Sequence, residues 1–146
     1  MFPLKDRKII GYKFGEKTWY TAHHLGVDYL AKLGTPIYAP FDGKIVNTLV
    51  GEQGGKTVWF KPEKDDCIMR FMHLSQIGCM KGDYVFEGKL IGLAGNTGSA
   101  TTGAHLHLDI SKNKVDIYNF SNFLDPEKYE WTTPDLTKCA ICGKEY

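Results

Sequence analysis

The chain has 146 residues, a length that is typical of one domain and sufficient to bury a core. Hydrophobic residues make up 42% of it and charged residues 24%, which is the composition of an ordinary globular protein. The formal net charge of +1 gives no indication of a nucleic-acid partner or of a polybasic membrane anchor.

The N-terminal segment, Met1 to Lys8, contains no apolar region of the kind that signal peptides carry. No stretch of the chain approaches the ~18 apolar residues of a membrane-spanning helix. We therefore expect a protein without a signal peptide and without a membrane span. Such a protein is made in the cytosol and reaches any extracellular substrate by another route.

The first motif lies between His23 and Asp28 and reads His-His-Leu-Gly-Val-Asp. His24 and Asp28 supply an imidazole and a carboxylate, which are both good zinc donors. Gly26 and Val27 argue against a helix, and Gly26 permits a bent or bulged strand that turns both donors inward. The motif alone is a weak signal, because His23 is an equally suitable ligand by residue type.

Short segments rich in β-branched and aromatic residues follow, and glycine-containing turns separate them. Many short strands at close spacing predict an all-β fold, mostly antiparallel, built as a two-sheet sandwich or barrel. We expect no long amphipathic helix. The expected strands are Pro36 to Ala39, Gly43 to Val50, Lys56 to Lys61, Cys67 to His73, Tyr84 to Phe86, Leu90 to Ala94 and His105 to Ile110.

Two of these segments, residues 34–45 and 82–92, are similar to each other. Each reads as a glycine turn, a strand, a second turn and another strand. The pair resembles the duplicated hybrid motif of lipoyl and biotinyl carriers. A carrier itself is a poor interpretation, because a carrier needs no cluster of histidines.

A second histidine motif occupies the strand expected at residues 105–110. His105, His107 and Asp109 alternate there with three aliphatic residues, which is the period of a strand. The two imidazoles therefore share one face, about 6.5 Å apart along the strand. One can bind a metal while the other reaches a water on it, although exposed strand histidines give the same pattern. Asp109 shares this face but reads equally well as a rim residue.

The combination of motifs is stronger than any one of them. The chain has five histidines, and they are confined to the two motifs above and to the string Arg70-Phe71-Met72-His73-Leu74-Ser75. Three protein ligands and an open water position make a catalytic zinc site, whereas four ligands close a structural one. His24, Asp28 and His107 give that count, which leaves His73 and His105 as unligated bases.

These strings resemble the signature of the lysostaphin-like, or LytM-type, zinc endopeptidases. The resemblance runs from about Thr21 to Ile110, and it includes the Gly-Asn-Thr-Gly-Ser loop before the second motif. Every metal and catalytic position of the family pattern is filled. The departures, such as Leu25 and Ala104, touch no ligand.

In that family, HxGxD supplies two zinc ligands and the second histidine of HxH supplies the third. The resemblance therefore implies zinc ligation by His24, Asp28 and His107. It also implies that His73 and His105 act on the water and the substrate, without fixing which of them is the general base.

The resemblance implies a zinc-dependent endopeptidase that cleaves the stem peptide or cross-bridge of bacterial peptidoglycan. Without a signal peptide, a phage-type lytic enzyme is expected, which reaches the cell wall through a separate pore or on a virion. Relatives that have lost ligands act as adaptors. Because His24, Asp28 and His107 are all present, the adaptor is the weaker hypothesis.

Two glycine-rich loops, residues 51–55 and 95–103, are the candidates for the walls of a substrate groove. Glycine allows a peptide backbone to approach closely. The aromatic residues that could line the groove are Trp19, Tyr20 and Trp59, although each is also a reasonable core or rim residue.

After the second motif, Ser121 to Tyr129 is expected to hold a short helical turn, capped by Asn119 or Ser121 and limited by Pro126. We place the peptidase domain at residues 1–130 and a tail at residues 131–146.

The four cysteines are too few for a disulfide scaffold, and free thiols are expected at Cys67 and Cys79. Cys139 and Cys142 form half of a zinc knuckle in the tail. This pair is either a second zinc site, completed by other residues or another chain, or a reduced and unliganded tail.

Overall fold

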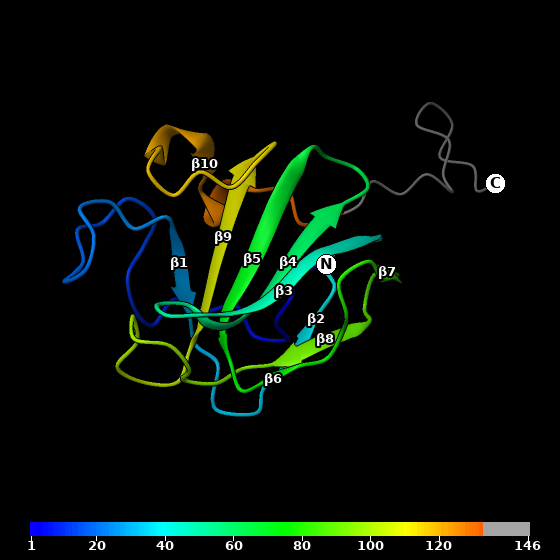
Figure 1. Cartoon of the computed structure of the whole chain (residues 1–146), viewed down its shortest axis with the longest axis horizontal. Coiled ribbons are helices and arrows are strands. Elements are labelled where there is room, and N and C mark those ends of the chain that lie inside the picture. Colours follow the sequence, from blue (N-terminus) through cyan, green and yellow to red (C-terminus); the bar gives the residue numbers. More distant parts are fainter. Residues whose placement is uncertain (133–146) are drawn as a thin grey trace, which may run out of the picture.

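In the computed structural model, which describes residues 1–132, the chain forms two antiparallel β-sheets and confirms the all-β prediction (Figure 1). The strands are β1 (Gly26–Tyr29), β2 (Pro36–Tyr38), β3 (Gly43–Gly51), β4 (Gly55–Pro62), β5 (Cys67–Leu74), β6 (Gln76–Ile77), β7 (Tyr84–Val85), β8 (Leu90–Leu93), β9 (Leu106–Lys112) and β10 (Phe123–Leu124). The larger sheet has the order β1-β9-β5-β4-β3-β7, with β10 paired to β9, and the smaller has the order β2-β8-β6.

Each expected strand forms, with ends that differ by at most two residues from the prediction. The sequence suggested β1 only as a bent or bulged strand at Gly26, and it did not predict β6 and β10. All four residues of β1 are buried, so the strand shows no alternation between polar and apolar positions. The other two strands have two residues each, too few for a pattern.

The two similar segments pair with each other. From the first segment come β2 and the start of β3, and from the second come β7 and β8. β2 pairs with β8 in the smaller sheet, and β3 pairs with β7 in the larger one. The duplicated segments thus contribute one strand each to both sheets, as a duplicated motif requires.

The larger sheet has one apolar face and one open face. Alternate residues of β4, β5 and β9, such as Phe60, Phe71 and Leu108, are fully buried in the core. The same core contains Ile37 from β2 and Ile91 from β8, so the smaller sheet covers this face. The intervening residues stand on the opposite face, which is where His107 and Asp109 of β9 lie.

Two short 3-10 turns, Phe120–Asn122 and Pro126–Lys128, replace the single helical turn expected near residues 121–129. Asn119 occupies the cap position of the first turn without a side-chain hydrogen bond, whereas the Asp125 side chain caps the second. Pro126 begins the second turn, since proline suits the first helical position.

Trp131 is buried and stacks on Phe41, so the packed part of the chain includes this residue, which we had assigned to the tail. Cys67 and Cys79 are free thiols, as expected. Cys139 and Cys142 lie outside the described residues. Between residues 1 and 132, no helix combines the length and the apolar character that crossing a bilayer requires.

Candidate metal centre

The short strand β1 lies beside β9 and brings the first motif to the second. Asp28 is directly opposite His107 in this pairing, and Gly26 is opposite Asp109. A Cβ atom on Gly26 would lie 2.1 Å from the carbonyl oxygen of Leu108, so any side chain would force the strands apart. The pairing is regular, and the bulge that we expected at Gly26 does not form. The glycine is needed for close approach instead.

His24 precedes β1 in a loop that backbone hydrogen bonds hold in place. Its N–H donates to the carbonyl of Glu16 at 2.7 Å, and its own carbonyl accepts from Gly15 at 2.8 Å. The ring is 1% exposed. His23, the rival ligand, is exposed and stacks on Phe120 with ring centroids 5.0 Å apart. The structure therefore brings His24, and not His23, to the cluster.

Three donor atoms form a nearly equilateral triangle. Nδ1 of His107 lies 3.2 Å from Nε2 of His24 and 3.3 Å from Oδ1 of Asp28. The third side, from Nε2 of His24 to Oδ1 of Asp28, measures 3.4 Å. A tetrahedral zinc ion with bonds of 2.0–2.1 Å separates its ligand atoms by about 3.3 Å. These side chains therefore already have the spacing that the ion requires.

The second nitrogen of each ring explains why a cation fits between them. Nδ1 of His24 lies 3.3 Å from the carbonyl oxygen of Lys13, and Nε2 of His107 lies 2.8 Å from Oδ2 of Asp109. Each of these nitrogens must donate a proton to its oxygen, which leaves a lone pair on the other nitrogen whenever the ring is neutral, as it is in a metal ligand. Two lone pairs and the Asp28 carboxylate then face one another, and such a donor set suits zinc.

Asp109 holds His107 and is itself held by Arg70. The Arg70 guanidinium donates from Nε at 2.8 Å and from Nη2 at 2.7 Å to the two carboxylate oxygens. Asp109 is fully buried, so interpreting it as a rim residue was wrong. Reasoning from sequence missed Arg70 altogether. The available signal was a lone arginine within the apolar string from Cys67 to Leu74.

The buried charges shift several pKa values in the metal-free protein. Burial alone would lower the pKa of His107, but the carboxylates of Asp109 and Asp28 outweigh it and raise the pKa to about 9. Burial would raise the pKa of Asp109, yet Arg70 and His107 lower it to about 2. Three histidines outweigh burial at Asp28 and hold its pKa far below its usual range. Both carboxylates thus stay ionised and favour a cation between the ligands.

His105 lies beside the triangle. Its Nδ1 lies 2.8 Å from the carbonyl oxygen of Gly103, and its Nε2 is 3.4 Å from Oδ1 of Asp28. It does not belong to the group of three whose donor atoms all lie within 4.8 Å of one another. The ring therefore has a free Nε2 near the cluster without being part of it.

His73 faces His105, with ring centroids 4.8 Å apart. Its Nδ1 lies 2.8 Å from the carbonyl oxygen of Thr97, which leaves Nε2 as an acceptor. Burial lowers the pKa of His73 to about 4, so the ring is neutral at pH 7. Its φ of 65° is an uncommon, strained value for a residue other than glycine, and such strain clusters at functional sites.

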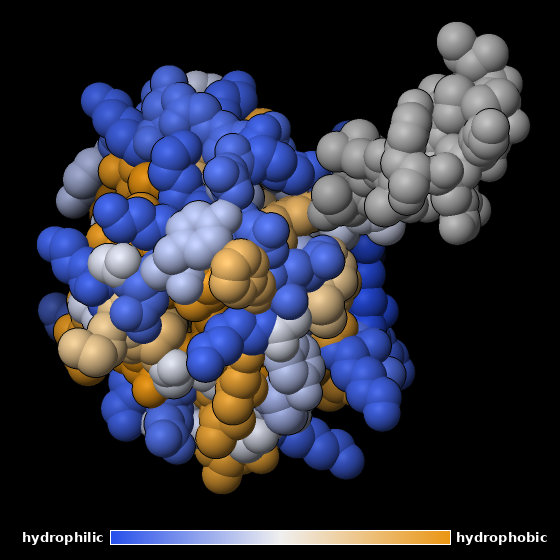
Figure 2. All heavy atoms as spheres, turned by 90° about the vertical axis from the view of Figure 1, so that its right-hand side faces the viewer, coloured by the Kyte–Doolittle hydropathy of each residue, from blue (hydrophilic) through white to orange (hydrophobic). Residues whose placement is uncertain are grey.

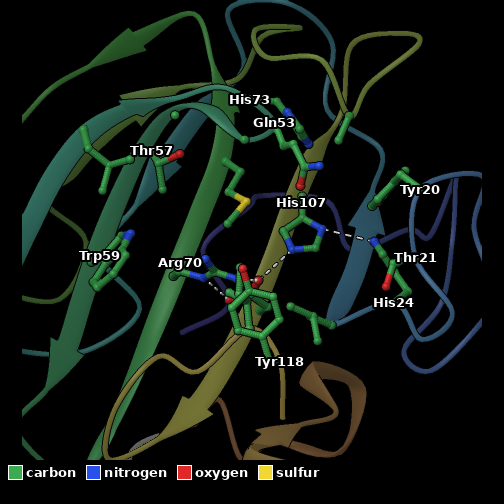
Figure 3. Close-up of a pocket in the computed structure, with 18 residues that line it drawn as sticks. Tyr20, Thr21, His24, Gln53, Thr57, Trp59, Arg70, His73, His107 and Tyr118 are labelled. Carbon is green, nitrogen blue, oxygen red and sulfur yellow. Dashed lines mark hydrogen bonds and ion pairs between the residues drawn. The ribbon is translucent and has the colours of Figure 1, made fainter. Parts of the chain in front are cut away.

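Two hollows meet at this cluster. The first, of about 360 Å³, lies over the open face of β4, β5 and β9 and is lined by His24, His73 and His107, together with residues 51, 53 and 54 (Figure 3). The second, of about 200 Å³, is lined by Asp28 and His105, with residues 100–103. Both glycine-rich loops therefore line the site, as expected. Trp59 lines the first hollow, Trp19 the second, and Tyr20 both.

Comparison with known proteins identifies the family. Residues 22–118 match peptidase family M23. The chain is 39% identical over 89 residues to the peptidoglycan DD-endopeptidase ShyA of Vibrio cholerae, covering 61% of this chain and 20% of that protein. It is 38% identical over 101 residues to the glycyl-glycine endopeptidase ALE-1 of Staphylococcus capitis, covering 68% and 26%. It thus spans about a quarter or less of the length of these relatives.

Among solved structures, the catalytic domain of lysostaphin from Staphylococcus simulans superposes with a TM-score of 0.72 at 32% identity, covering 80% of this chain and 87% of that one. Fold, motifs and family match thus agree over the same central region. The chain belongs to peptidase family M23, as a lysostaphin-like member.

Proposed function

We propose that this chain is a zinc-dependent endopeptidase that hydrolyses peptide bonds of bacterial peptidoglycan. The observation that carries the proposal is the triangle of donor atoms from His24, Asp28 and His107, with the Nε2 atoms of two further histidines beside it. The choice of peptidoglycan is supported by the family and by relatives that act as peptidoglycan DD-endopeptidase and glycyl-glycine endopeptidase.

A zinc ion held by these three side chains would lower the pKa of a water molecule and polarise the scissile carbonyl group. The protein itself contributes the placement of the proton acceptors. Nε2 of His105 lies beside the Asp28 carboxylate, which stabilises this ring when it becomes a cation. We assign to His105 the removal of the proton from the attacking water and its delivery to the leaving amine.

His73 has a different role in this proposal. Its low pKa makes it a poor proton acceptor but keeps the ring neutral, and Thr97 fixes its orientation. A neutral Nε2 accepts a hydrogen bond, so we assign to His73 the orientation of the water or of a substrate N–H. The strained φ of His73 persists because the surrounding structure enforces it, which is common where a side chain must be placed for function.

The two hollows suggest how the peptide lies. Their walls share Tyr20 and Ala100, and the metal ligands are divided between them. An extended peptide that occupies both hollows passes across the donor triangle, so the scissile bond would lie at their junction.

The test is digestion of purified peptidoglycans of different cross-link chemistry, followed by mass analysis of the fragments. We expect new amino termini at one type of peptide bond, loss of cleavage with a chelator, and recovery with zinc. Stoichiometric zinc without hydrolysis of any wall type would contradict the proposal. Action at the cell wall after phage-type lysis, or on a virion, stays a prediction from the sequence.

A further inference from the structure

The floor of the first hollow carries a row of side chains from adjacent strands. Trp59 of β4 is directly opposite Arg70 of β5, and Arg70 is directly opposite Asp109 of β9. Directly opposite residues share a face, with Cβ atoms about 5 Å apart. The next row on this face contains Met72 and His107. The Trp59 row therefore lies two residues, about 6.5 Å, along the strands from the row of His107, and Trp59 itself lies two strands, about 10 Å, across from β9.

Trp59 has an unmet hydrogen-bond donor. Within residues 1–132, its Nε1 is the single buried side-chain nitrogen or oxygen that has no hydrogen-bond partner. A buried donor without a partner costs free energy, and native proteins rarely keep one without a reason. Figure 3 shows the nitrogen on the side of the indole that faces Arg70 and His107. Trp59 is half-buried and lines the hollow, so a small rotation of the indole would open Nε1 to a ligand oxygen there.

Arg70 also has donors to spare. Its side chain is 9% exposed, and it lines the same hollow. Nε and Nη2 donate to Asp109, whereas no hydrogen bond to any residue of the described chain uses Nη1. Both carboxylate oxygens of Asp109 already accept hydrogen bonds from Arg70 and His107. The Arg70–Asp109 pair therefore offers a ligand donors but no free acceptor. A ligand that binds here must therefore supply oxygen acceptors.

The surroundings favour an anionic acceptor. Asp109 is the one acidic residue in the lining of this hollow, as far as residues 1–132 show, and its charge is already paired. The remaining wall is largely apolar, and a low local dielectric strengthens a hydrogen bond between a guanidinium and a carboxylate. The apolar lining residues are Leu49, Met72 and Ile117, beside the aromatic Tyr118.

We propose that Trp59 and Arg70 form a subsite for a carboxylate of the substrate peptide, on the open face of the sheet beside the metal centre. This inference rests on the proposed function and names its substrate class: a stem peptide with a free carboxyl group beside the cross-link. A bridge made of glycine alone offers only backbone carbonyl groups to the same donors.

The test uses two synthetic cross-linked stem-peptide dimers that differ in one group, a carboxylate in one and a carboxamide in the other. The zinc-loaded wild-type protein should cleave the carboxylate form with a kcat/KM about tenfold higher, since a hydrogen bond to a charged group is at stake. Trp59→Phe removes the N–H and keeps an aromatic ring. It should raise KM for the carboxylate form severalfold, leave kcat unchanged and reduce the preference.

Tyr84→Phe is the matched control. It also removes one donor from an aromatic residue, but the Tyr84 hydroxyl is exposed and bonded to Glu63, outside the hollow. This variant should keep the tenfold preference. Thermal unfolding of both variants shows whether each one folds.

Equal kcat/KM values for the two dimers, or faster cleavage of pentaglycine than of either dimer, would overturn the subsite and leave the peptidase proposal intact. If the zinc-loaded protein cleaves none of these peptides, the peptidase proposal fails. In that case the affinities of the protein for the two dimers, measured by calorimetry, test the subsite. Tighter binding of the carboxylate form that Trp59→Phe abolishes supports it, and equal binding overturns it.

Discussion

The metal cluster on β1 and β9 and the histidine pair beside it use ring nitrogens in different ways. In the cluster, His107 gives its second nitrogen to a buried carboxylate that an arginine holds in turn. In the pair, both rings give theirs to neutral backbone carbonyls. Each of the four rings has such a contact, but only His107 has a charged anchor, since the anchor of His24 is the carbonyl of Lys13.

This difference gives His107 and His73 opposite pKa shifts. The charged anchor helps to raise the pKa of His107 to about 9, which makes its free nitrogen electron-rich and suited to a metal. The carbonyl anchor cannot offset the burial of His73, whose pKa falls to about 4. The anchors of His107 and His73 thus shift their pKa values in opposite directions, and the following changes test whether the two rings have different tasks.

The largest effect is expected from His107→Ala. Losing one of three ligands should weaken zinc binding far more than the roughly 10–100-fold that loss of a ligand's hydrogen-bond partner causes. Zinc and turnover should disappear together, as metal analysis after dialysis and a peptide-cleavage assay would show. His23→Ala, an exposed histidine next to His24, should keep both. A His107→Ala protein with stoichiometric zinc would contradict the ligand assignment.

His105→Ala should separate the two regions, because this ring lies beside the cluster without being a ligand. We expect zinc to stay bound while kcat falls by about 10²–10⁴-fold, the usual contribution of a positioned acid–base group. His73→Asn, chosen because asparagine tolerates a positive φ, should also keep zinc and lower kcat. If His105→Ala instead removed the metal, the roles of His105 and His107 would be reversed.

A smaller change is expected from Asp109→Asn, which weakens the charged anchor alone. Zinc affinity should fall by about 10–100-fold in a chelator competition titration. Urea unfolding should show a loss of roughly 3–5 kcal/mol, because Arg70 stays buried without its counter-charge. Asp66→Asn, in an exposed pair with Lys61, should change neither quantity noticeably. An unaltered affinity in Asp109→Asn would show that the anchor does not act on the metal.

The most subtle expectation concerns pH. In the zinc-free protein the folded-state pKa of His107, about 9, lies above its ordinary value of 6.5. Its contribution to stability is therefore fully present below pH 6.5 and is lost as pH rises through 9. With zinc on Nδ1 this proton is absent, so the loss should disappear. Melting curves in EDTA and in zinc between pH 6 and 10 test this. A zinc-free protein with the same pH profile as His107→Gln would contradict it.

Local patterns in the sequence predicted much of this site. The alternation of His105, His107 and Asp109 with aliphatic residues placed the histidines on one face, and the family resemblance chose the donors that the structure brings together. Strand register was not predictable, because the pairing of Arg70 with Asp109 joins residues 39 positions apart. The role of Asp109 and the unmet donor of Trp59 both follow from that register.

The smaller elements show the same limit. β1 is buried along its whole length, and its place beside β9 depends on Gly26, whose close contact is with a strand about 80 residues further along the chain. Composition suggested conformational freedom at this glycine, and so a bulge. Only the neighbouring strand shows that the absence of a side chain is what matters.

The most direct test is a crystal structure of the zinc-loaded protein with anomalous data at the zinc absorption edge. We expect one peak at the active site, about 2.0–2.2 Å from Nε2 of His24, Oδ1 of Asp28 and Nδ1 of His107. A peak bound by His73 and His105 instead, or none near these five residues in zinc-saturated crystals, would contradict the metal centre described above.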